Sequence, residues 1–322
     1  MNESVLLADI GGTYARFSLM HGTTRTAPMH FATRDFPTAA TAIRHFLQSE
    51  PTISPPTRAV IAAAGPVISG RIEMPNAAWN LDAEILMQEL HFDQIELIND
   101  FAAQAWAVPS FTPADLRQIG GGAANLSEPQ VILGAGTGFG LAIRCVDAGH
   151  ETIIVTEGGH ATLTAHNTAE SQMLEKLRQY HAHISIERVL SGPGLVTLYQ
   201  QLACDSGVTE TARVAPEIAA RGMRGECEIC AAALTMFCGW LGSVIGNITL
   251  TTGARGGIYI SGGVVPHFVD FLTASAFRER FEQKGRMGKY LHAIPIFVVL
   301  NHDPAFLGLA RFAENKARGF AP

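Results

Sequence analysis

The feature that most constrains the fold is a pattern that occurs twice, once at the start of each half of the chain. Residues 5–20 read VLLADIGGTYARFSLM and residues 131–146 read VILGAGTGFGLAIRCV. Each has an apolar run, a glycine-rich break and a second apolar run, which predicts a strand, a tight turn and a strand. Self-similarity of this kind indicates a duplicated domain.

Predicted strands and helices alternate along the rest of the chain. Strands are expected at residues 58–64, 72–74, 94–98, 152–155, 257–261 and 295–300. Helices are expected at residues 38–49, 80–90 (capped by Asn80), 101–108, 170–180, 187–203 (interrupted by Gly-Pro-Gly), 216–221, 227–251, 266–277 and 304–316. Residues 110–125 are rich in Gly, Pro and Thr, which is typical of a connection. The prediction is an α/β architecture in two lobes.

Composition favours a soluble metabolic protein of about two domains. The chain has 322 residues, 47% of them hydrophobic and 16% charged, with a formal net charge of −6. A nucleic-acid partner would require a basic face, so none is expected. Residues 229–254 carry no charge and are long enough to span a bilayer, but they contain several glycines and threonines and lack basic flanks. We therefore expect a buried helix there and no membrane association, and the N-terminal residues do not resemble a signal peptide.

The cysteines indicate a reducing compartment. There are five, an odd number, at positions 145, 204, 227, 230 and 238. Cys227 and Cys230 form a CxxC motif, but no second ligand pair for zinc follows it, and its flanks look helical rather than thioredoxin-like. The favoured interpretation is a pair packed in a helical core.

The two glycine turns are candidate phosphate-binding loops. Successive backbone N–H groups in such turns can surround an anion, and no Cβ prevents its close approach. In the first turn Asp9 adds a carboxylate for a hydrated Mg²⁺ and Thr13 a hydroxyl for a phosphate oxygen, although a plain hairpin explains that turn equally well. The second turn, with glycines on both sides of Thr137, is more specific. The dinucleotide pattern GxGxxG fails because Phe139 occupies a glycine position, and a P-loop is absent.

Asn99 and Asp100 follow a predicted strand and precede a predicted helix. Ligands of open α/β sheets bind at the carboxyl ends of strands, and phosphoryl transfer requires a base that orients the acceptor hydroxyl. Asp100 is therefore the candidate base, and Asn99 can both donate to and accept from a neighbouring hydroxyl. The alternative, which is favoured when the pair is taken alone, is that both residues only cap the helix.

Three more polar side chains are candidates for binding vicinal hydroxyls. Glu157 and His160 lie in a polar turn, and Glu187 precedes an apolar helix. Taken singly, each has an ordinary explanation, such as a solvated helix start for Glu187. Gly262-Gly263 follows a predicted strand. These glycines either let the backbone approach the adenine or ribose of a nucleotide closely or form a simple strand-to-helix turn.

Taken in order, these motifs resemble one known family. The segments ADIGGTYARFS, LINDFAA, GAGTGFGLA, EGGHATL, ERVLSGPGL and ISGGVVP are similar to those of bacterial glucokinases, in the hexokinase group of the sugar kinase–actin–heat-shock chaperone superfamily. The resemblance spans nearly the whole chain. It implies a duplicated, ribonuclease-H-like (actin-like ATPase) fold with central mixed sheets. It also implies a small lobe of residues 1–110 with 300–322, a large lobe of residues 111–299, and glucose and ATP in the cleft between them.

The resemblance also implies roles for individual residues. Asp100 would be the base for the 6-hydroxyl of glucose, and the sugar ligands would be Asn99, Asp100, Glu157, His160 and Glu187. The nucleotide would contact Ala8, Asp9, Ile10, Gly11, Gly12, Thr13, Gly136, Thr137, Gly138, Gly262 and Gly263. Mg²⁺ would be held near Asp9 through water. A cytoplasmic homodimer is the implied state.

The chain departs from the family pattern at two places. Tyr14 stands where a smaller polar residue is common, and residues 301–308, NHDPAFLG, replace a form that usually contains Asn-Pro-Gly. Two rival functions remain open: a kinase for another hexose, such as fructose, mannose or an N-acetylated sugar, and a non-catalytic ATP-binding regulator. The intact Asp100 argues against the regulator.

Overall fold

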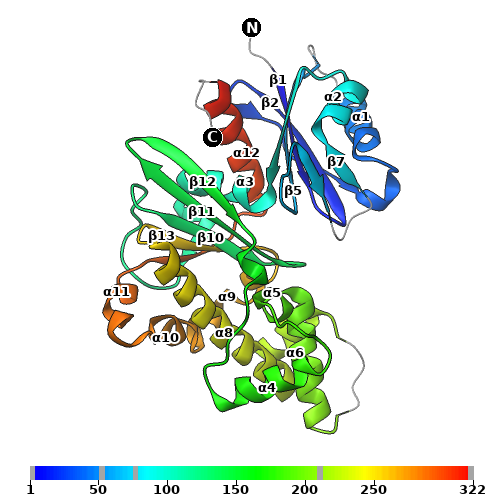
Figure 1. Cartoon of the computed structure of the whole chain (residues 1–322). Coiled ribbons are helices and arrows are strands. Elements are labelled where there is room, and N and C mark those ends of the chain that lie inside the picture. The colour runs from blue at the N-terminus through cyan, green and yellow to red at the C-terminus, as the bar shows by residue number, and fades with distance from the viewer. Residues whose placement is uncertain (1–3, 51–54, 75–78, 209–212, 318–322) are drawn as a thin grey trace. The chain divides into compact units, whose positions relative to one another are not determined.

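The computed structural model describes residues 4–50, 55–74, 79–208 and 213–317, and the chain divides into two compact units. The first unit comprises residues 1–111 with 302–322, and the second comprises residues 112–301. Each unit contains one large β-sheet and its own hydrophobic core. Figure 1 shows the described elements of both units.

The first unit is built on a mixed sheet in the order β3-β2-β1-β5-β8, with β4 paired to β2. Its described strands are β1 (Ser4–Ile10), β2 (Tyr14–His21), β3 (Thr24–Arg25), β4 (Met29–Ala32), β5 (Arg58–Ala63) and β8 (Gln94–Asn99), and a separate hairpin joins β6 (Arg71–Glu73) to β7 (Asn80–Asp82). β1 is buried along its whole length, which explains why its sequence is apolar almost throughout.

Helices cover both faces of this sheet. They are α1 (Ala39–Ser49), α2 (Ala83–Leu90), α3 (Asp100–Ala107) and α12 (Pro304–Ala317). α1 and α2 pack into the core on one face, and α3 and α12 lie side by side on the other, as Figure 1 shows. The carboxyl ends of β1, β5 and β8 are therefore held between two layers of helix.

The second unit repeats the strand pattern of the first. Its sheet order is β12-β11-β10-β13-β14-β9. The strands are β9 (Leu116–Gln118), β10 (Gln130–Ala135), β11 (Phe139–Asp147), β12 (His150–Thr156), β13 (Gly257–Ser261) and β14 (Ile296–Val299). In both units an antiparallel hairpin begins the sheet, and its first strand pairs in parallel with a later strand, which pairs in parallel with the next. The predicted duplicated α/β fold with mixed sheets is confirmed.

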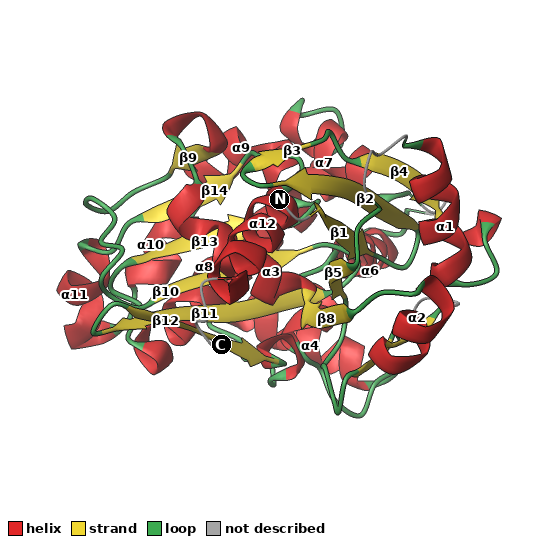
Figure 2. Cartoon of the chain, turned by 90° about the horizontal axis from the view of Figure 1, so that it is seen from above, coloured by secondary structure: helices red, strands yellow, loops and turns green. Residues whose placement is uncertain are grey.

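The described helices of the second unit include α8, which is the longest of them. They are α4 (Thr168–Arg178), α5 (Ile186–Val189), α6 (Gly192–Asp205), α7 (Ala215–Met223), α8 (Glu228–Thr252), α9 (Val269–Ala274), α10 (Phe277–Glu282) and α11 (Gly288–His292). Among the described residues α8 is the one helix long and apolar enough to cross a membrane, but 67% of its most apolar window is buried. It packs against α6, α7 and α10, so it is a core helix, as the sequence predicts. In the view of Figure 2, α8 and α10 lie behind the strands of the second sheet.

Three local predictions are wrong. Asn80 does not cap a helix: it begins β7, and Asp82 caps α2 by accepting from the N–H groups of Glu84 (3.0 Å) and Ile85 (3.2 Å). The predicted connection at residues 110–125 contains β9, which pairs with β14. The single helix expected at residues 266–277 is broken into a 3₁₀ turn, α9 and α10, because Ser275 ends α9 and its hydroxyl accepts from the Phe277 N–H at the start of α10.

Candidate active site

The first glycine turn, residues 11–13, joins β1 to β2 and presents its backbone to solvent. Gly11 N–H donates to the carbonyl of Tyr14 (2.9 Å), which closes the turn. Thr33 supports it from one side, because its hydroxyl donates to the carbonyl of Gly12 (2.8 Å) and its N–H to that of Thr13 (3.0 Å). Gly12 and Thr13 are exposed, so their N–H groups and the Thr13 hydroxyl can meet a phosphate.

The residues before this turn contribute differently. Ala8 and Ile10 have no exposed surface and belong to the hydrophobic core, so their side chains cannot contact a nucleotide. Asp9 points to the other face of the strand and is 5% exposed. Of this segment, Asp9 and the turn itself are the parts whose chemistry suits a phosphate and its metal ion.

Asp9 is held by a basic side chain that sequence reasoning missed. Arg16 lies directly opposite it in the β1–β2 register, and one guanidinium nitrogen pairs with the Asp9 carboxylate while another donates to Asp303 at 2.9 Å. Burial raises the pKa of Asp9 by removing water from its charge; Arg16 opposes this rise, and the nearby charge of Asp303 adds to it. The strand-turn-strand prediction could have revealed the pair, because a symmetric hairpin places these two positions opposite each other.

Asn99 and Asp100 lie at the same edge of the sheet as the first turn. In the register of the parallel strands, Ile10 aligns with Ala63 and Ala63 with Asn99. Asn99 is the N-cap of α3: its amide oxygen accepts from Phe101 N–H (2.9 Å) and Ala102 N–H (3.1 Å). Its amide nitrogen donates to the carbonyl of Gly65 (3.2 Å). The capping role that the sequence left open is therefore real for Asn99.

Asp100 begins α3 and is partly exposed. Its Oδ1 accepts from the N–H of Phe101 at 2.9 Å, which fixes the orientation of the carboxylate. The position at the first turn of a helix also favours a negative charge there.

A pocket of about 750 Å³ lies near these residues in the first unit. Pro66, which lines it, follows Gly65, whose carbonyl accepts the Asn99 hydrogen bond. Its described lining residues are Pro66, Ile68, Ser69, Arg71, Glu73, Met74 and Asn80. The mixed polar and apolar lining suits a small polar ligand.

The second glycine turn, residues 136–138, is held by hydrogen bonds within the turn and from neighbouring segments. Gly136 N–H donates to the carbonyl of Gly138 (2.8 Å), and the N–H of Gly192, at the start of α6, donates to the carbonyl of Gly136 (2.8 Å). Glu187 accepts the N–H of Phe139 through its Oε2 (2.8 Å). Thr137, at the tip of the turn, is exposed to solvent. The hydrogen bonds therefore hold the two ends of the turn and leave Thr137 accessible to a ligand.

Gly262 and Gly263 lie at the same edge of the second sheet, since Ser261 pairs with Gly134. Gly262 has φ of +88°, and a Cβ there would lie 2.4 Å from the carbonyl oxygen of Ala135. No other residue fits at this point, because both the backbone conformation and the space demand glycine. Gly263 has open space around it and is exposed.

Glu157 and His160 are brought close to Glu187 by a short strand-like pairing. Backbone hydrogen bonds join residue 163 to 184 and residue 186 to 161, so the 3₁₀ turn at Gly158–His160 lies beside the start of α5. The His160 Nε2 and Glu157 Oε2 atoms are 3.9 Å apart, and both side chains are more than half exposed. The second unit thus gathers three predicted sugar ligands and a predicted phosphate turn.

The side chains around Asp9 are compatible with a Mg²⁺ ion held through water, which remains a prediction. No group of three His, Cys, Asp or Glu side chains that could hold a metal ion is found in the part of the chain that the structure describes. Asp9 is the carboxylate nearest the first turn, and one of its oxygens is already paired with Arg16. Contact through water, with the nucleotide phosphates supplying direct ligands, suits such a carboxylate.

Comparisons with known proteins agree with this geometry. A family model described as Glucokinase matches residues 6–316. A glucokinase of Nitrobacter hamburgensis is 39% identical over 305 residues, 95% of both chains, and one of Aromatoleum aromaticum is 40% identical over 319 residues, 98% of this chain and 96% of the other.

Solved structures of glucokinases also resemble this chain. The crystal structure of a glucokinase from an Antarctic psychrotroph has a TM-score of 0.85 and 37% identity, and covers 98% of this chain and 100% of its own. A ROK family glucokinase from Streptomyces griseus, in complex with glucose and AMPPNP, has a TM-score of 0.70 at 18% identity, covering 97% of this chain and 99% of its own; it shares the fold. The resemblance carried by the motifs is confirmed, and the chain belongs to the glucokinase family.

Proposed function

We propose that this protein transfers the γ-phosphoryl group of ATP to the 6-hydroxyl of D-glucose, with Asp100 as the general base. The family match over residues 6–316 carries the reaction and its substrates. The placement of Asp100 supports the residue assignment, since it lies at the carboxyl edge of the first sheet with its carboxylate oriented by a backbone N–H. Phosphoryl transfer needs such a base to receive the hydroxyl proton as the acceptor attacks.

The five residues that the sequence singled out would serve the sugar site in two ways: Asp100, Glu157, His160 and Glu187 would contact the sugar, and Asn99 would mainly support Asp100. Glu157 and His160 present exposed polar atoms suited to vicinal hydroxyls. Glu187 anchors the second glycine turn through Oε2 and would meet the sugar through Oε1. Asn99, engaged at both ends of its side chain, would act mainly by fixing the position of Asp100.

The nucleotide would lie against the glycine turns. Residues 11–13 and 136–138 would donate N–H groups to the phosphates, and Gly262-Gly263 would border the adenosine. Mg²⁺, held near Asp9 through water, would neutralise the phosphate charge that develops during transfer. Arg16 keeps Asp9 in place and supplies the charge that compensates its burial.

Two further properties follow from family membership as proposals. The chain is expected to work in the cytoplasm, in keeping with its five cysteines, none of them in a disulfide, and as a homodimer. The sequence-based lobes, residues 1–110 with 300–322 and 111–299, are expected to close on the substrates and exclude water. Size-exclusion chromatography with light scattering tests the dimer.

The first experiment is a coupled ADP-release assay with a panel of glucose, mannose, fructose and N-acetylglucosamine. Asp100→Asn keeps the shape of the side chain but removes the base, so turnover should fall by ~10²–10⁴ while glucose binding is kept. Asp93→Asn, an exposed carboxylate just before β8, is the matched control and should behave as wild type. Normal turnover by Asp100→Asn would refute the base assignment, and equal use of another hexose would refute the preference for glucose.

A further inference from the structure

The first turn of α8 contains two cysteines in contact, away from the groups used by the proposed reaction. Cys227 is the N-cap of the helix, and its sulfur accepts the backbone N–H of Cys230 at 3.4 Å. Cys227 is partly exposed, and Cys230 is buried. All five cysteines are free thiols.

The two thiols differ in the way that a reactive dithiol requires. Cys227 is partly exposed; burial acts to raise its pKa, but hydrogen bonds from Cys230 and Ile229 and the charge of Arg221 outweigh this and lower it. Cys230 is buried, and burial raises its pKa to about 12. Cys227 is thus suited to act as the attacking thiolate, and Cys230 is suited to remain a protonated thiol until the second step.

We propose that Cys227 and Cys230 form a redox-active dithiol that exchanges with the disulfide of a small thiol carrier. The Cys227 thiolate attacks one carrier sulfur, forming a mixed disulfide and releasing the other half as a thiolate. Cys230 then loses its proton to solvent and attacks the Cys227 sulfur, which forms the protein disulfide and releases the second half. The protein pair loses two electrons, the carrier disulfide gains two, and the two thiol protons pass through solvent to the released thiolates.

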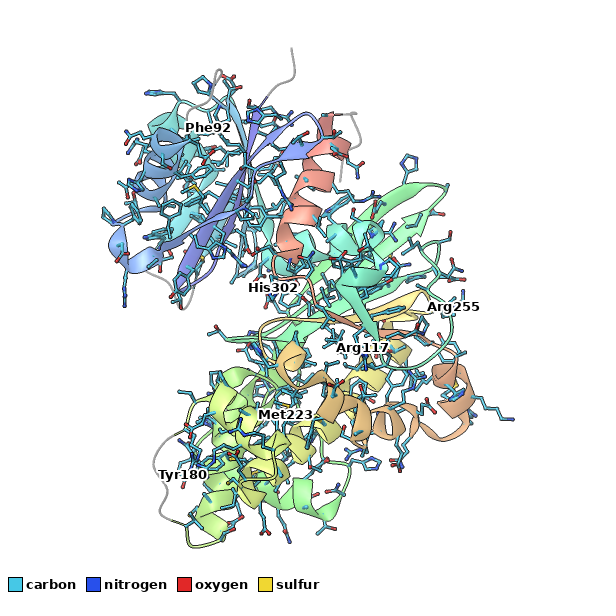
Figure 3. The ribbon with its side chains drawn as sticks, turned by 180° about the vertical axis from the view of Figure 1, so that it is seen from behind. Phe92, Arg117, Tyr180, Met223, Arg255 and His302 are labelled. Atoms are coloured by element: carbon cyan, nitrogen blue, oxygen red, sulfur yellow. The ribbon has the colours of Figure 1, made fainter. Side chains whose placement is uncertain are left out.

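The surroundings of the pair connect it to the second glycine turn. Cys230 packs tightly on α7, where a Cβ on Gly222 would lie 3.0 Å from the Cys230 carbonyl. The other end of α7 borders Gly192, because a Cβ there would touch Ala215 at 3.9 Å. Gly192 holds the turn through its hydrogen bond to Gly136. Figure 3 labels Met223, which ends α7 near the pair. A disulfide that shifts α7 would therefore displace the second glycine turn, which the proposed function places against the ATP phosphates.

The test is incubation of the whole enzyme with oxidised glutathione, followed by peptide mass mapping. The expected product is a Cys227–Cys230 disulfide that dithiothreitol reverses. Cys230→Ala should instead accumulate glutathione on Cys227, because the resolving thiol is gone. Cys227→Ser, which keeps a good N-cap, should take up no glutathione at position 230. Cys204→Ser, at an exposed cysteine, is the control and should still form the disulfide.

Two results would overturn the proposal. If the wild-type enzyme forms no disulfide at 227–230, or if Cys230→Ala traps no adduct at Cys227, the pair is only a packed core feature. In a fully oxidised sample the KM for ATP should change severalfold while Cys227→Ser is unaffected by oxidant; an unchanged KM would refute the link through α7. The mass readout does not depend on kinase activity, so its failure is distinguishable from failure of the proposed function.

Discussion

At the scale of single residues, the first phosphate turn depends on one guanidinium. Arg16 bridges Asp9 and Asp303, so it joins the end of β1 to the residue that precedes α12. Asp303 precedes Pro304 and Ala305 in this chain. It supplies a second carboxylate to Arg16, and its charge raises the pKa of Asp9.

Removing Arg16 should leave Asp9 as a buried, uncompensated charge. Breaking a fully buried pair typically costs about 3–5 kcal/mol, and because the Arg16 side chain is 29% exposed we expect Arg16→Ala to lower the free energy of unfolding by less than this at pH 7. Burial already raises the pKa of Asp9 above that of the unfolded chain, and losing Arg16 raises it further. The penalty is thus present above the folded pKa and disappears as the pH falls through it and Asp9 takes up a proton.

Urea unfolding of Arg16→Ala at pH 7 and pH 5 measures this dependence. Adding Asp9→Asn to Arg16→Ala should restore much of the lost stability at pH 7, because no buried charge then remains. A double variant as unstable as Arg16→Ala would show that the guanidinium acts through packing instead.

At the scale of elements, α3 and α12 pack closely against each other in the first unit. Gly308, on α12, is buried, and a Cβ there would lie 1.6 Å from the carbonyl oxygen of Ala103 on α3. The two helices approach so closely that only a hydrogen atom fits at this point. Since Asp100 begins α3, this crossing also supports the candidate base.

Gly308→Ala should destabilise the protein although alanine is the better helix former by about 1 kcal/mol. Forcing the helices apart typically costs about 1–3 kcal/mol, so overpacking outweighs propensity. Asn315→Ala, two turns later in α12, lacks this contact and should be neutral or slightly stabilising. Thermal unfolding of both variants checks the difference, and a higher midpoint for Gly308→Ala would contradict the packing argument.

Predictions from local pattern succeeded for elements that their own residues define. The helix at Cys227–Thr251 and both glycine hairpins follow from apolar runs and breaks, and the structure has α8 at Glu228–Thr252. β9 was missed because three residues in a polar stretch carry no signal; pairing with β14, far along the chain, makes them a strand. Asn80 and Asp82 are both good cap residues by type, and the pairing of β6 with β7 makes Asn80 part of a strand and leaves Asp82 as the N-cap of α2.

At the scale of the whole molecule, two units with separate cores supply the candidate residues. Asn99, Asp100 and the first turn belong to one unit, and Glu157, His160, Glu187 and the second turn to the other. A ligand stabilises whatever holds it, by about 2.7 kcal/mol at a concentration 100 times its Kd. Comparing the unfolding of each unit with and without glucose therefore shows which unit binds the sugar.

Glucose at that concentration should raise the unfolding midpoint of both units, if the proposed sugar ligands from each unit act together. Calorimetry, with hydrogen exchange to assign the transitions, measures this. Asp100→Asn should keep the effect, whereas His160→Ala, at an exposed position, should weaken it without much change in the sugar-free protein. His181→Ala is the control. Protection of a single unit would contradict a shared sugar site.

The sequence by itself determined the duplicated design, the glycine turns, the candidate base and the family, because these depend on residue types at short spacing. Only the tertiary structure decided that Arg16 holds Asp9, that Asn99 caps α3, that Glu187 fixes the second turn and that the Cys227 sulfur accepts the backbone N–H of Cys230. Each of these depends on backbone segments brought together by folding or on the direction of a side chain, and neither is encoded in local pattern.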